Sequence, residues 1–430
     1  MMTRTDLSFG FSQRARRSSR QPISELMALA VTRPDLISLA AGLVDYDLLP
    51  SQSTAELAHK VLADPRRSRA SLQYGTTPGL RSLRSALLEH LEQLDGTGPG
   101  GLDATVNDLI VTTGSQQMLF ILTDLLVDPG DIVITGWPSY FVYTGTLASA
   151  GAQVRCVDVD ADGFVPESLE SLLAELQAEG QIERVKIVYI VSYHQNPTGL
   201  TVAEDRRARL VEIVRRYSTC HRILLLEDAA YRELTYEGHV PRSIKSYDEG
   251  NQTVALLQTF SKPFSPGLKT GYALLPTDLV GPAVIQKGNH DFGSVNFVQE
   301  ILGQAMAGGE YQRHLRTVCA GYARKRDAML AAMEEHFGGD EHVHWTRPTG
   351  GLYVWLTLPS RIDTGADSPL CAAALEEGMI YVPGEYCFGP DSRRQRPTNC
   401  IRLSFGLAGT DQIAEGIARL ARAYHGLADA

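Results

Sequence analysis

The sequence lacks several features that would direct it to a membrane, to nucleic acid or to a metal. No stretch approaches the roughly 20 apolar residues that a membrane-spanning helix needs. Its 40 basic residues are outnumbered by 50 acidic ones, and the net charge of −10 argues against nucleic-acid binding. The cysteines form neither a CxxC pair nor the spacing of metal ligands, which predicts reduced thiols in a cytoplasmic protein and no metal site. The six cysteines are Cys156, Cys220, Cys319, Cys371, Cys387 and Cys400.

The composition that remains is that of an ordinary soluble enzyme. Hydrophobic residues make up 43% of the chain and charged residues 21%. A chain of 430 residues exceeds what a single hydrophobic core usually serves, so we expect two domains. Composition alone indicates no particular reaction.

Three apolar runs, each typical of a buried parallel strand, lead into a polar side chain. The side chains are Asn196, Asp228 and Lys262, and the runs lie at 187–191, 223–228 and 254–257. Ligands of an open parallel α/β sheet bind beyond the carboxyl ends of its strands. We therefore expect these three residues at one edge of a sheet, where they would form a site.

The residue types at this edge suit one kind of chemistry. Lys262 stands in a loop of small residues and two prolines. A surface lysine needs no such setting, whereas a lysine that holds an aldehyde cofactor as a Schiff base must be positioned and partly desolvated. Asp228 could keep a pyridine nitrogen protonated, while Tyr231 and Asn196 could bind the phenolic oxygen of the same ring. Once a substrate amine displaces Lys262, its free amine could move the α-proton.

A second junction of strand and helix offers an anion site. The strand expected at 108–113 is followed by Gly114, Ser115 and Gln116 at the start of a helix. Unpaired backbone N–H groups and the helix dipole attract an anion at such a junction, although glycine and serine are common there. Two residues close to the lysine of the loop could complete a phosphate cup: Ser261 and Lys269.

The ordered set of motifs resembles the pyridoxal-phosphate aminotransferases of fold type I, class I/II, in the aspartate aminotransferase superfamily. The resemblance runs from about Leu39 to the C-terminus and is nearest to the aminoadipate and kynurenine aminotransferase subgroup. Each motif alone has an ordinary structural explanation, but the set in this order is highly specific. The matching segments are Gln73-Tyr74-Gly75, Asn196-Pro197-Thr198-Gly199, Asp228-Ala229-Ala230-Tyr231, Ser261-Lys262, Pro348-Thr349-Gly350-Gly351-Leu352-Tyr353-Val354-Trp355, Val382-Pro383-Gly384 and Arg402.

The resemblance implies a role for each matching position. Lys262 would bind pyridoxal 5'-phosphate covalently, and Arg402 would bind the α-carboxylate of the substrate beside the backbone of Gly42. Tyr140 would cover the ring of the cofactor. Tyr74 would reach the phosphate from a partner subunit, so a homodimer is expected. The other cofactor contacts would come from Gly114, Ser115, Gln116, Asn196 (which would also contact the substrate), Asp228, Tyr231, Ser261 and Lys269.

The activity that the resemblance implies is transfer of the amino group of an L-amino acid to a 2-oxo acid such as 2-oxoglutarate or pyruvate. The alternative is another reaction of the same fold and cofactor: an elimination, a decarboxylation or an oxygen-dependent deamination. Several positions depart from the family, among them Ser192 and Gly136-Trp137-Pro138. Lys269 stands where the family mostly has arginine, so the phosphate contact would keep its charge but lose the fork geometry. Ser24 stands where the subgroup has an arginine that could bind a distal carboxylate, which leaves the substrate open.

The expected fold is α/β. A large domain would contain a mainly parallel, seven-stranded type of sheet between helices, and a smaller α/β domain would follow it. The periodic stretch at 311–337 predicts a long helix that leaves the large domain. We expect an N-terminal arm at 1–20, a segment at 21–50 that joins the small domain, the cofactor-binding domain at 51–303, and the linking helix with the small domain at 304–430.

Two hypotheses from other classes fit the sequence less well. A transcriptional regulator with an aminotransferase-like module would need a DNA-binding domain ahead of the fold, and the residues before Gly42 are too few for one. A nicotinamide dehydrogenase would need a Gly-x-Gly-x-x-Gly turn between a strand and a helix. The segment 96–101 has that pattern, but it follows a helical stretch, so we expect a flexible loop there.

Overall fold

The computed structural model describes residues 9–18, 32–33 and 35–428. Ser24 and half of the expected N-terminal arm (1–8 and 19–20) therefore lie outside the described residues. The described part of the arm is the short helix α1 (Gln13–Arg17), which packs on α7 (Phe141–Ala150). The Arg14 guanidinium there pairs with the Asp124 carboxylate at 2.5 Å.

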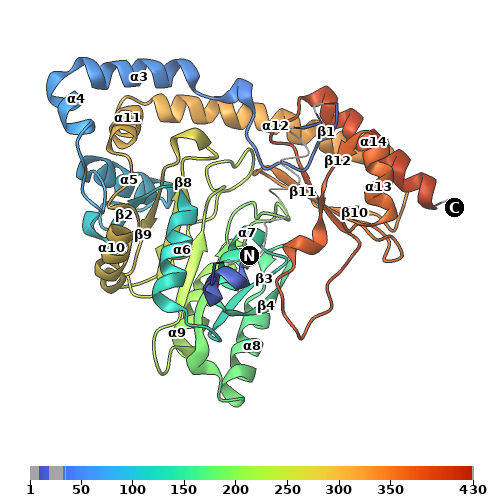
Figure 1. Cartoon of the computed structure of the whole chain (residues 1–430), viewed down its shortest axis with the longest axis horizontal. Helices are drawn as coiled ribbons and strands as arrows, with labels where there is room; N and C mark the ends of the chain where they lie inside the picture. The colour runs from blue at the N-terminus through green and yellow to red at the C-terminus, as the bar shows by residue number, and fades with distance from the viewer. Residues whose placement is uncertain (1–8, 19–31, 34, 429–430) are drawn as a thin grey trace, which may run out of the picture.

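The large sheet has eight strands in the order β2-β9-β8-β7-β6-β3-β4-β5 (Figure 1). Five neighbouring strands, from β4 to β8 across the sheet, run parallel, while β9 lies antiparallel between β2 and β8. The α/β fold with a mainly parallel sheet is confirmed, with one strand beyond the expected seven because a two-residue strand extends the edge. The strands are β2 (Leu109–Thr112), β3 (Ile132–Trp137), β4 (Gln153–Asp160), β5 (Gly163–Phe164), β6 (Val185–Val191), β7 (Leu224–Asp228), β8 (Val254–Thr259) and β9 (Gly271–Leu274).

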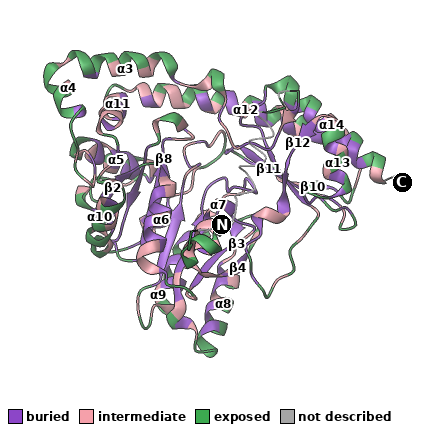
Figure 2. Cartoon of the chain, in the orientation of Figure 1, coloured by how far each residue is buried: buried purple, intermediate pink, exposed green. Residues whose placement is uncertain are grey.

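Helices cover both faces of this sheet because its central strands are apolar on both sides. Leu226 packs in one core, and its neighbour Leu225 packs in another on the opposite face, as the alternation of side chains along a strand requires. Figure 2 shows the resulting buried strands between helices whose outer faces are exposed. The first core includes α6 (Ser115–Leu126), α7 and α10 (Thr277–Asp291); the second includes α8 (Pro166–Ala178) and α9 (Glu204–Tyr217); a third joins α5 (Arg81–Leu94), α3 (Ser51–Ala63) and α11 (Asn296–Ala307) to the sheet.

A second, smaller sheet is antiparallel and has the strand order β10-β11-β14-β13. The long helix α12 (Glu310–Phe337) and α14 (Thr410–Ala428) pack with it in one core. In Figure 1, α12 connects the two sheets, which confirms the long helix expected at 311–337. The remaining elements are β10 (His344–Trp345), β11 (Tyr353–Thr357), α13 (Pro369–Glu376), β12 (Met379–Ile380), β13 (Val382–Pro383) and β14 (Cys400–Ser404), with β1 (Ile37–Ser38) paired to β12 and α4 (Pro65–Ser71) following α3.

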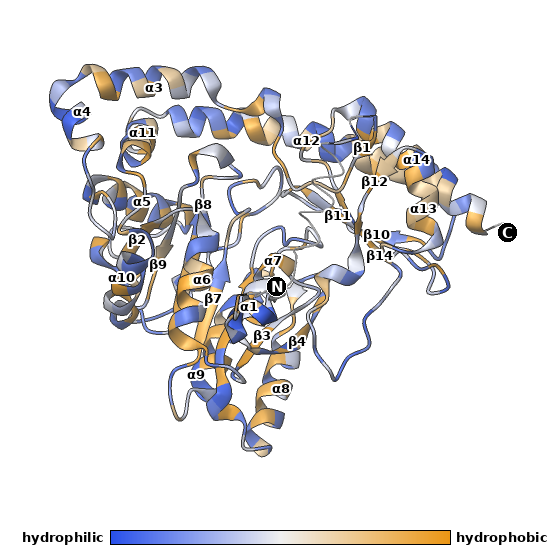
Figure 3. Ribbon diagram, in the orientation of Figure 1, coloured by the Kyte–Doolittle hydropathy of each residue, from blue (hydrophilic) through white to orange (hydrophobic). Residues whose placement is uncertain are grey.

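Hydropathy follows the layers. Figure 3 shows apolar residues along the sheet strands and the inward sides of the helices, with hydrophilic residues outside. None of the described helices is long and apolar enough to cross a membrane. The glycine pattern at 96–101 lies between α5 and the short 3-10 helix Val106–Asp108, so it does not follow a strand and is a loop, as expected.

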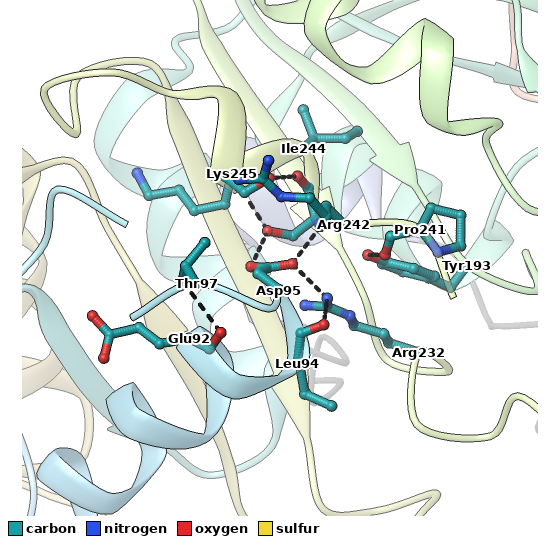
Figure 4. A network of polar contacts seen from close by, with 12 residues as sticks. Glu92, Leu94, Asp95, Thr97, Tyr193, Arg232, Pro241, Arg242, Ile244 and Lys245 are labelled. Atoms are coloured by element: carbon teal, nitrogen blue, oxygen red, sulfur yellow. Dashed lines mark hydrogen bonds and ion pairs between the residues drawn. The ribbon is translucent and has the colours of Figure 1, made fainter. Parts of the chain in front are cut away.

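A buried polar network fixes the turn that follows β7 (Figure 4). Arg232 lies just beyond Asp228 in the chain and pairs with Asp95 at the end of α5. The Asp95 carboxylate also accepts hydrogen bonds from the Ser243 N–H at 2.6 Å and hydroxyl at 2.7 Å. Both charged side chains are fully buried. This ion pair ties the turn after β7 to the end of α5.

Removing one member of this pair should be severely destabilising. Asp95→Ala leaves the Arg232 guanidinium buried without its carboxylate, so we expect the free energy of unfolding to fall by about 3–5 kcal/mol. Asp160→Ala is the control, because Asp160 pairs with Arg206 at the surface and should contribute less than about 1 kcal/mol. Urea denaturation of both variants measures the difference. Equal losses would contradict the structural role assigned to the buried pair.

Candidate active site

One pocket of about 290 Å³ opens at the carboxyl ends of the central strands. Asn196, Asp228 and Lys262 all line it, although each follows a different strand. The prediction that these three residues meet at one edge of the sheet is therefore confirmed. Of the residues predicted to form the site, the pocket lining includes Gly42, Gly114, Ser115, Gln116, Tyr140, Asn196, Asp228, Tyr231, Ser261, Lys262 and Lys269.

Aromatic packing positions the loop that carries Lys262. Phe260 and Phe264 flank the lysine and are both buried. Their rings lie 5.5 and 5.9 Å from the ring of Tyr311 on α12. The lysine itself is only partly buried, and its Nζ donates a hydrogen bond of 2.8 Å to the carbonyl oxygen of Gly42. The amine thus lies in the pocket with one neutral acceptor among the residues that the structure describes, and it can react with an aldehyde.

Asp228 is a buried carboxylate with neutral partners. Its side chain accepts a hydrogen bond of 2.9 Å from the Tyr189 hydroxyl and one of 3.2 Å from the Ala230 N–H. Burial raises the pKa of Asp228 from 3.8 to about 6, and these hydrogen bonds only partly offset that rise. A protonated pyridine nitrogen would supply the missing positive charge, since buried carboxylates are stable when paired. The carboxylate therefore fits the ring of pyridoxal phosphate.

Arg402 shows the complementary feature, because this buried cation has no salt bridge to an acidic residue within the described part of the chain. The side chain extends from β14, is 1% exposed, and donates to Asn196 Oδ1 at 3.0 Å and to the carbonyl oxygen of Ala40 at 2.7 Å. Within the described part of the chain, its Nε has no hydrogen-bond partner. A carboxylate would satisfy both the charge and the free N–H group. Arg402 does not line the pocket itself but reaches it through Asn196.

The start of α6 provides the anion-binding end of the pocket. Its N-cap is Gly114, with a φ of 75°, and no side chain caps the first turn, so the N–H groups at Ser115 and Gln116 remain available to a ligand. Ser261 is held at this end because its N–H donates to Thr259 Oγ1 at 3.1 Å. Lys269 has a φ of 49°, in the left-handed region that a lysine rarely adopts. This set of donors suits a phosphate.

Of the two tyrosines predicted to contact the ring and the phosphate of the cofactor, Tyr140 lies in the pocket and Tyr74 lies outside it. Tyr140 lines the pocket from the position immediately before α7, where its ring can cover a planar ligand. Tyr74 is not in this pocket. It is 82% exposed and lies beside Phe292 at the rim of a separate hollow. A contribution of Tyr74 to a site would require a second chain.

Sequence reasoning missed two tyrosines whose hydroxyls contact residues of the site. Tyr189 lies in the middle of β6 and holds Asp228, but a tyrosine in an apolar strand usually indicates packing. Tyr353 begins β11, and its hydroxyl lies 3.2 Å from that of Tyr231. It belongs to a segment that matches the family, yet nothing in the sequence indicates that its hydroxyl meets that of Tyr231. Its alternation along β11 predicts only that it faces one side of that sheet.

Gly42 leaves room for the Tyr353 hydroxyl. A Cβ at position 42 would lie 2.5 Å from Tyr353 Oη, while the next atom, Cζ, would be 3.6 Å away. We expect Gly42→Ala to lower the free energy of unfolding by about 1–3 kcal/mol through this overlap. Adding Tyr353→Phe removes the overlapping atom and should recover most of the loss. Denaturation of the cofactor-free variants measures both effects, and a double variant no more stable than Gly42→Ala would contradict this explanation.

Comparison with known proteins identifies the family. A family model described as aminotransferase class I and II matches residues 34–420. The aromatic-amino-acid aminotransferase 1 of Thermococcus litoralis is 34% identical, covering 96% of this chain and 93% of that protein. The 2-aminoadipate transaminase of Thermus thermophilus is 30% identical, covering 98% of both.

The structures agree with the sequences. The kynurenine aminotransferase of Pyrococcus horikoshii, solved in complex with PMP and with KYN as substrate and KYA as product, superposes with a TM-score of 0.88. It is 32% identical, and the match covers 97% of each chain. These likenesses support amino-group transfer rather than elimination, oxygen-dependent deamination or hydride transfer. The chain belongs to the class I and II aminotransferases and is a pyridoxal-phosphate-dependent enzyme of fold type I.

Proposed function

We propose that Lys262 carries the cofactor of this aminotransferase and that Asp228 and Arg402 orient the cofactor and the substrate around it. The observation that supports this most is that two buried charged residues of the site have no counter-charge among the described residues. Asp228 is a buried carboxylate with neutral partners, and Arg402 is a buried guanidinium whose Nε lacks a partner among the described residues. The ring nitrogen of the cofactor and the α-carboxylate of an amino acid would complete both.

Each residue has a distinct task in the transfer. When bound, pyridoxal phosphate supplies an aldehyde and a ring that withdraws electrons from the α-carbon. Once a substrate amine has replaced it on the cofactor, Lys262 Nζ would take the α-proton of the substrate and deliver it to the carbon of the former aldehyde group of the cofactor. Asp228 keeps the ring nitrogen protonated, and Tyr231 and Asn196 donate to the phenolic oxygen. Arg402 holds the α-carboxylate so that the α-proton faces the lysine.

The phosphate and the ring face are held by the remaining lining residues. Backbone N–H groups at the start of α6, together with Ser115, Gln116, Ser261 and Lys269, bind the phosphate. The Lys269 side chain supplies charge without the paired geometry of an arginine. Tyr140 packs on the ring, and the backbone of Gly42 borders the substrate.

The donor that we propose is an L-amino acid with a large apolar side chain. Leu43 and Val44 follow Gly42 in the pocket wall and present an apolar surface. Relatives named for aromatic amino acids and for kynurenine support the same class. The amino group would then pass to a 2-oxo acid such as 2-oxoglutarate or pyruvate.

A donor panel tests this function. The holoenzyme is assayed with twenty L-amino acids and either 2-oxoglutarate or pyruvate, and the 2-oxo acid formed from each donor is quantified. We expect the highest kcat/KM for aromatic donors, with amino-acid product formed in equal amount from the acceptor. Highest kcat/KM for aspartate or glutamate as donor would overturn the proposed substrate class. Release of ammonia without consumption of the acceptor would overturn the assignment of the reaction at this site.

We also propose that the enzyme acts as a homodimer in which Tyr74 serves the partner's pocket. Tyr74 lines a hollow of about 550 Å³ with several exposed apolar side chains, an arrangement typical of a surface that another chain covers. The exposed side chains of this face are Leu72, Tyr74, Phe292 and Val295.

Mixed dimers test the role of Tyr74 directly. Tyr74→Ala and Lys262→Ala should each reduce the activity of a homodimer. Unfolding and reassembling the two variants together creates heterodimers with one intact site, formed by Lys262 of one chain and Tyr74 of the other. Equal mixing should therefore restore roughly a quarter of the wild-type activity. No recovery, with heterodimers verified by differential tags, would show that Tyr74 does not act across the interface.

The division of the chain remains part of this proposal. We assign 51–303 to the cofactor-binding domain and 304–430 to the linking helix and the small domain, with 21–50 joining the small domain and 1–20 as an arm. The pairing of β1 with β12 supports the assignment of the 21–50 segment. We further propose a cytoplasmic location, which the six free cysteines support.

A further inference from the structure

Tyr353, at the start of β11 in the small sheet, places its hydroxyl against Tyr231, which lines the cofactor pocket. Its side chain is buried, and its Oη lies 3.2 Å from the Tyr231 Oη. The two rings meet edge to face, with centroids 5.7 Å apart and an interplanar angle of 78°. The ring face of Tyr353 packs against the Arg402 guanidinium, whose central carbon is 4.6 Å from the ring centroid. Tyr353 therefore touches both a proposed cofactor ligand and the proposed carboxylate ligand.

The glycine opposite Tyr353 indicates that the hydroxyl has a required place. The φ of Gly42 lies outside the left-handed region, so backbone conformation does not demand a glycine at this position. A Cβ there would instead overlap the Tyr353 Oη at 2.5 Å. The carbonyl of the same glycine accepts the hydrogen bond from Lys262 Nζ. The chain thus leaves space for this hydroxyl next to the reactive lysine.

The role proposed for Tyr231 decides which of the two hydroxyls donates. Each tyrosine hydroxyl has a single proton, and in this pair either oxygen could be the donor. If Tyr231 gives its proton to the phenolic oxygen of the cofactor, the hydrogen bond between the two tyrosines can form only with Tyr353 as the donor.

We propose that Tyr353 is a positioning residue, whose hydroxyl donates to the Tyr231 oxygen and directs the Tyr231 proton toward the phenolic oxygen of the cofactor. This inference rests on the proposed function, in which Tyr231 binds that oxygen. A hydrogen bond received by the Tyr231 oxygen polarises its O–H group and strengthens the bond that it donates. Tyr353 thereby tunes the cofactor without touching it.

The visible absorption band of the bound cofactor changes with pH, and hydrogen-bond donors to the phenolic oxygen lower the pH of this change. The pH dependence of the band in the holoenzyme therefore tests the role of Tyr353. Tyr231→Phe removes the direct donor and should raise the midpoint pH of the absorbance change by about one unit, which corresponds to the free energy of about one hydrogen bond. Tyr353→Phe should raise it in the same direction by about a third of that amount. In the Tyr231→Phe background, Tyr353→Phe should have no further effect, because no donor remains to be polarised.

The possible outcomes distinguish a failure of the role of Tyr353 from a failure of the proposed function on which it rests. An unchanged midpoint in Tyr231→Phe would overturn the role proposed for Tyr231 itself. A normal effect of Tyr231→Phe, with no effect of Tyr353→Phe or with an equal effect in both backgrounds, would overturn the role of Tyr353 alone. Tyr381→Phe is the control for loss of a buried hydroxyl, since Tyr381 donates to the Thr364 carbonyl oxygen at 3.1 Å and does not line the pocket. A shift in that control would also overturn the inference, because any loosening of the small sheet would then suffice.

Discussion

Lys262→Ala is expected to lower kcat/KM by at least about 10⁴-fold, the upper range for loss of a positioned proton-transfer group. The variant also loses the amine that attaches the cofactor covalently. The fold should be unaffected, because the Lys262 side chain is only partly buried and its Nζ makes one hydrogen bond, to Gly42. Steady-state kinetics with the best donor and 2-oxo acid measure the loss, and circular dichroism verifies the fold.

Two comparisons make this result specific. Lys262→Arg retains a positive charge but cannot form a Schiff base, so it should be as inactive as the alanine variant. Lys186→Ala removes a lysine whose Nζ caps the carbonyl of Glu183 outside the pocket, and its activity should equal that of the wild type. Substantial turnover by either Lys262 variant would show that another group transfers the proton.

Asp228→Asn is expected to stabilise the cofactor-free protein while it impairs catalysis. At pH 7.5 the folded wild type contains a charged carboxylate whose pKa burial has raised from 3.8 to about 6. That rise opposes folding by up to about 3 kcal/mol once the pH exceeds the folded pKa. The neutral amide avoids this penalty. Without the carboxylate the ring nitrogen loses its counter-charge, so kcat should fall by about 10²–10³-fold.

The pH dependence of this stabilisation has a definite sign. Between about pH 4 and 6 the folded protein binds more protons at Asp228 than the unfolded chain does, so the stability of the wild type falls as the pH rises. The advantage of Asp228→Asn should therefore appear across this range, reach its full size above pH 6, and vanish near pH 4. Urea denaturation of the cofactor-free proteins at several pH values measures it. A constant difference at all pH values would contradict the explanation by burial.

The residues of the site that follow strands could be predicted from the sequence because a local pattern fixes them. Asn196, Asp228 and Lys262 each come after an apolar run, and the rule that parallel strands end at one edge places them together. The start of α6 was predictable for the same reason, since Gly114 and Ser115 mark a junction of strand and helix. The long helix α12 followed from its periodicity.

The remaining contacts depend on how distant segments meet, which no local pattern records. Tyr353 reaches Tyr231 because the turn after β7 packs in the core of the small sheet, and the two residues are far apart in the chain. The pair of Asp95 and Arg232 likewise joins the end of a helix to a turn after a strand. The short strand β5 escaped prediction because two residues carry no periodicity. The proposed contribution of Tyr74 to a cofactor pocket depends on a partner subunit, which the sequence of one chain does not position.

The most direct test of the central claim is to locate the cofactor on the chain. The protein is incubated with pyridoxal phosphate, reduced with borohydride, digested and analysed by mass spectrometry. The account predicts one phosphopyridoxyl group, on the peptide that contains Lys262, with fragmentation assigning it to Lys262 rather than to Lys269. A modification on another lysine, or no modification of the native protein, would contradict it.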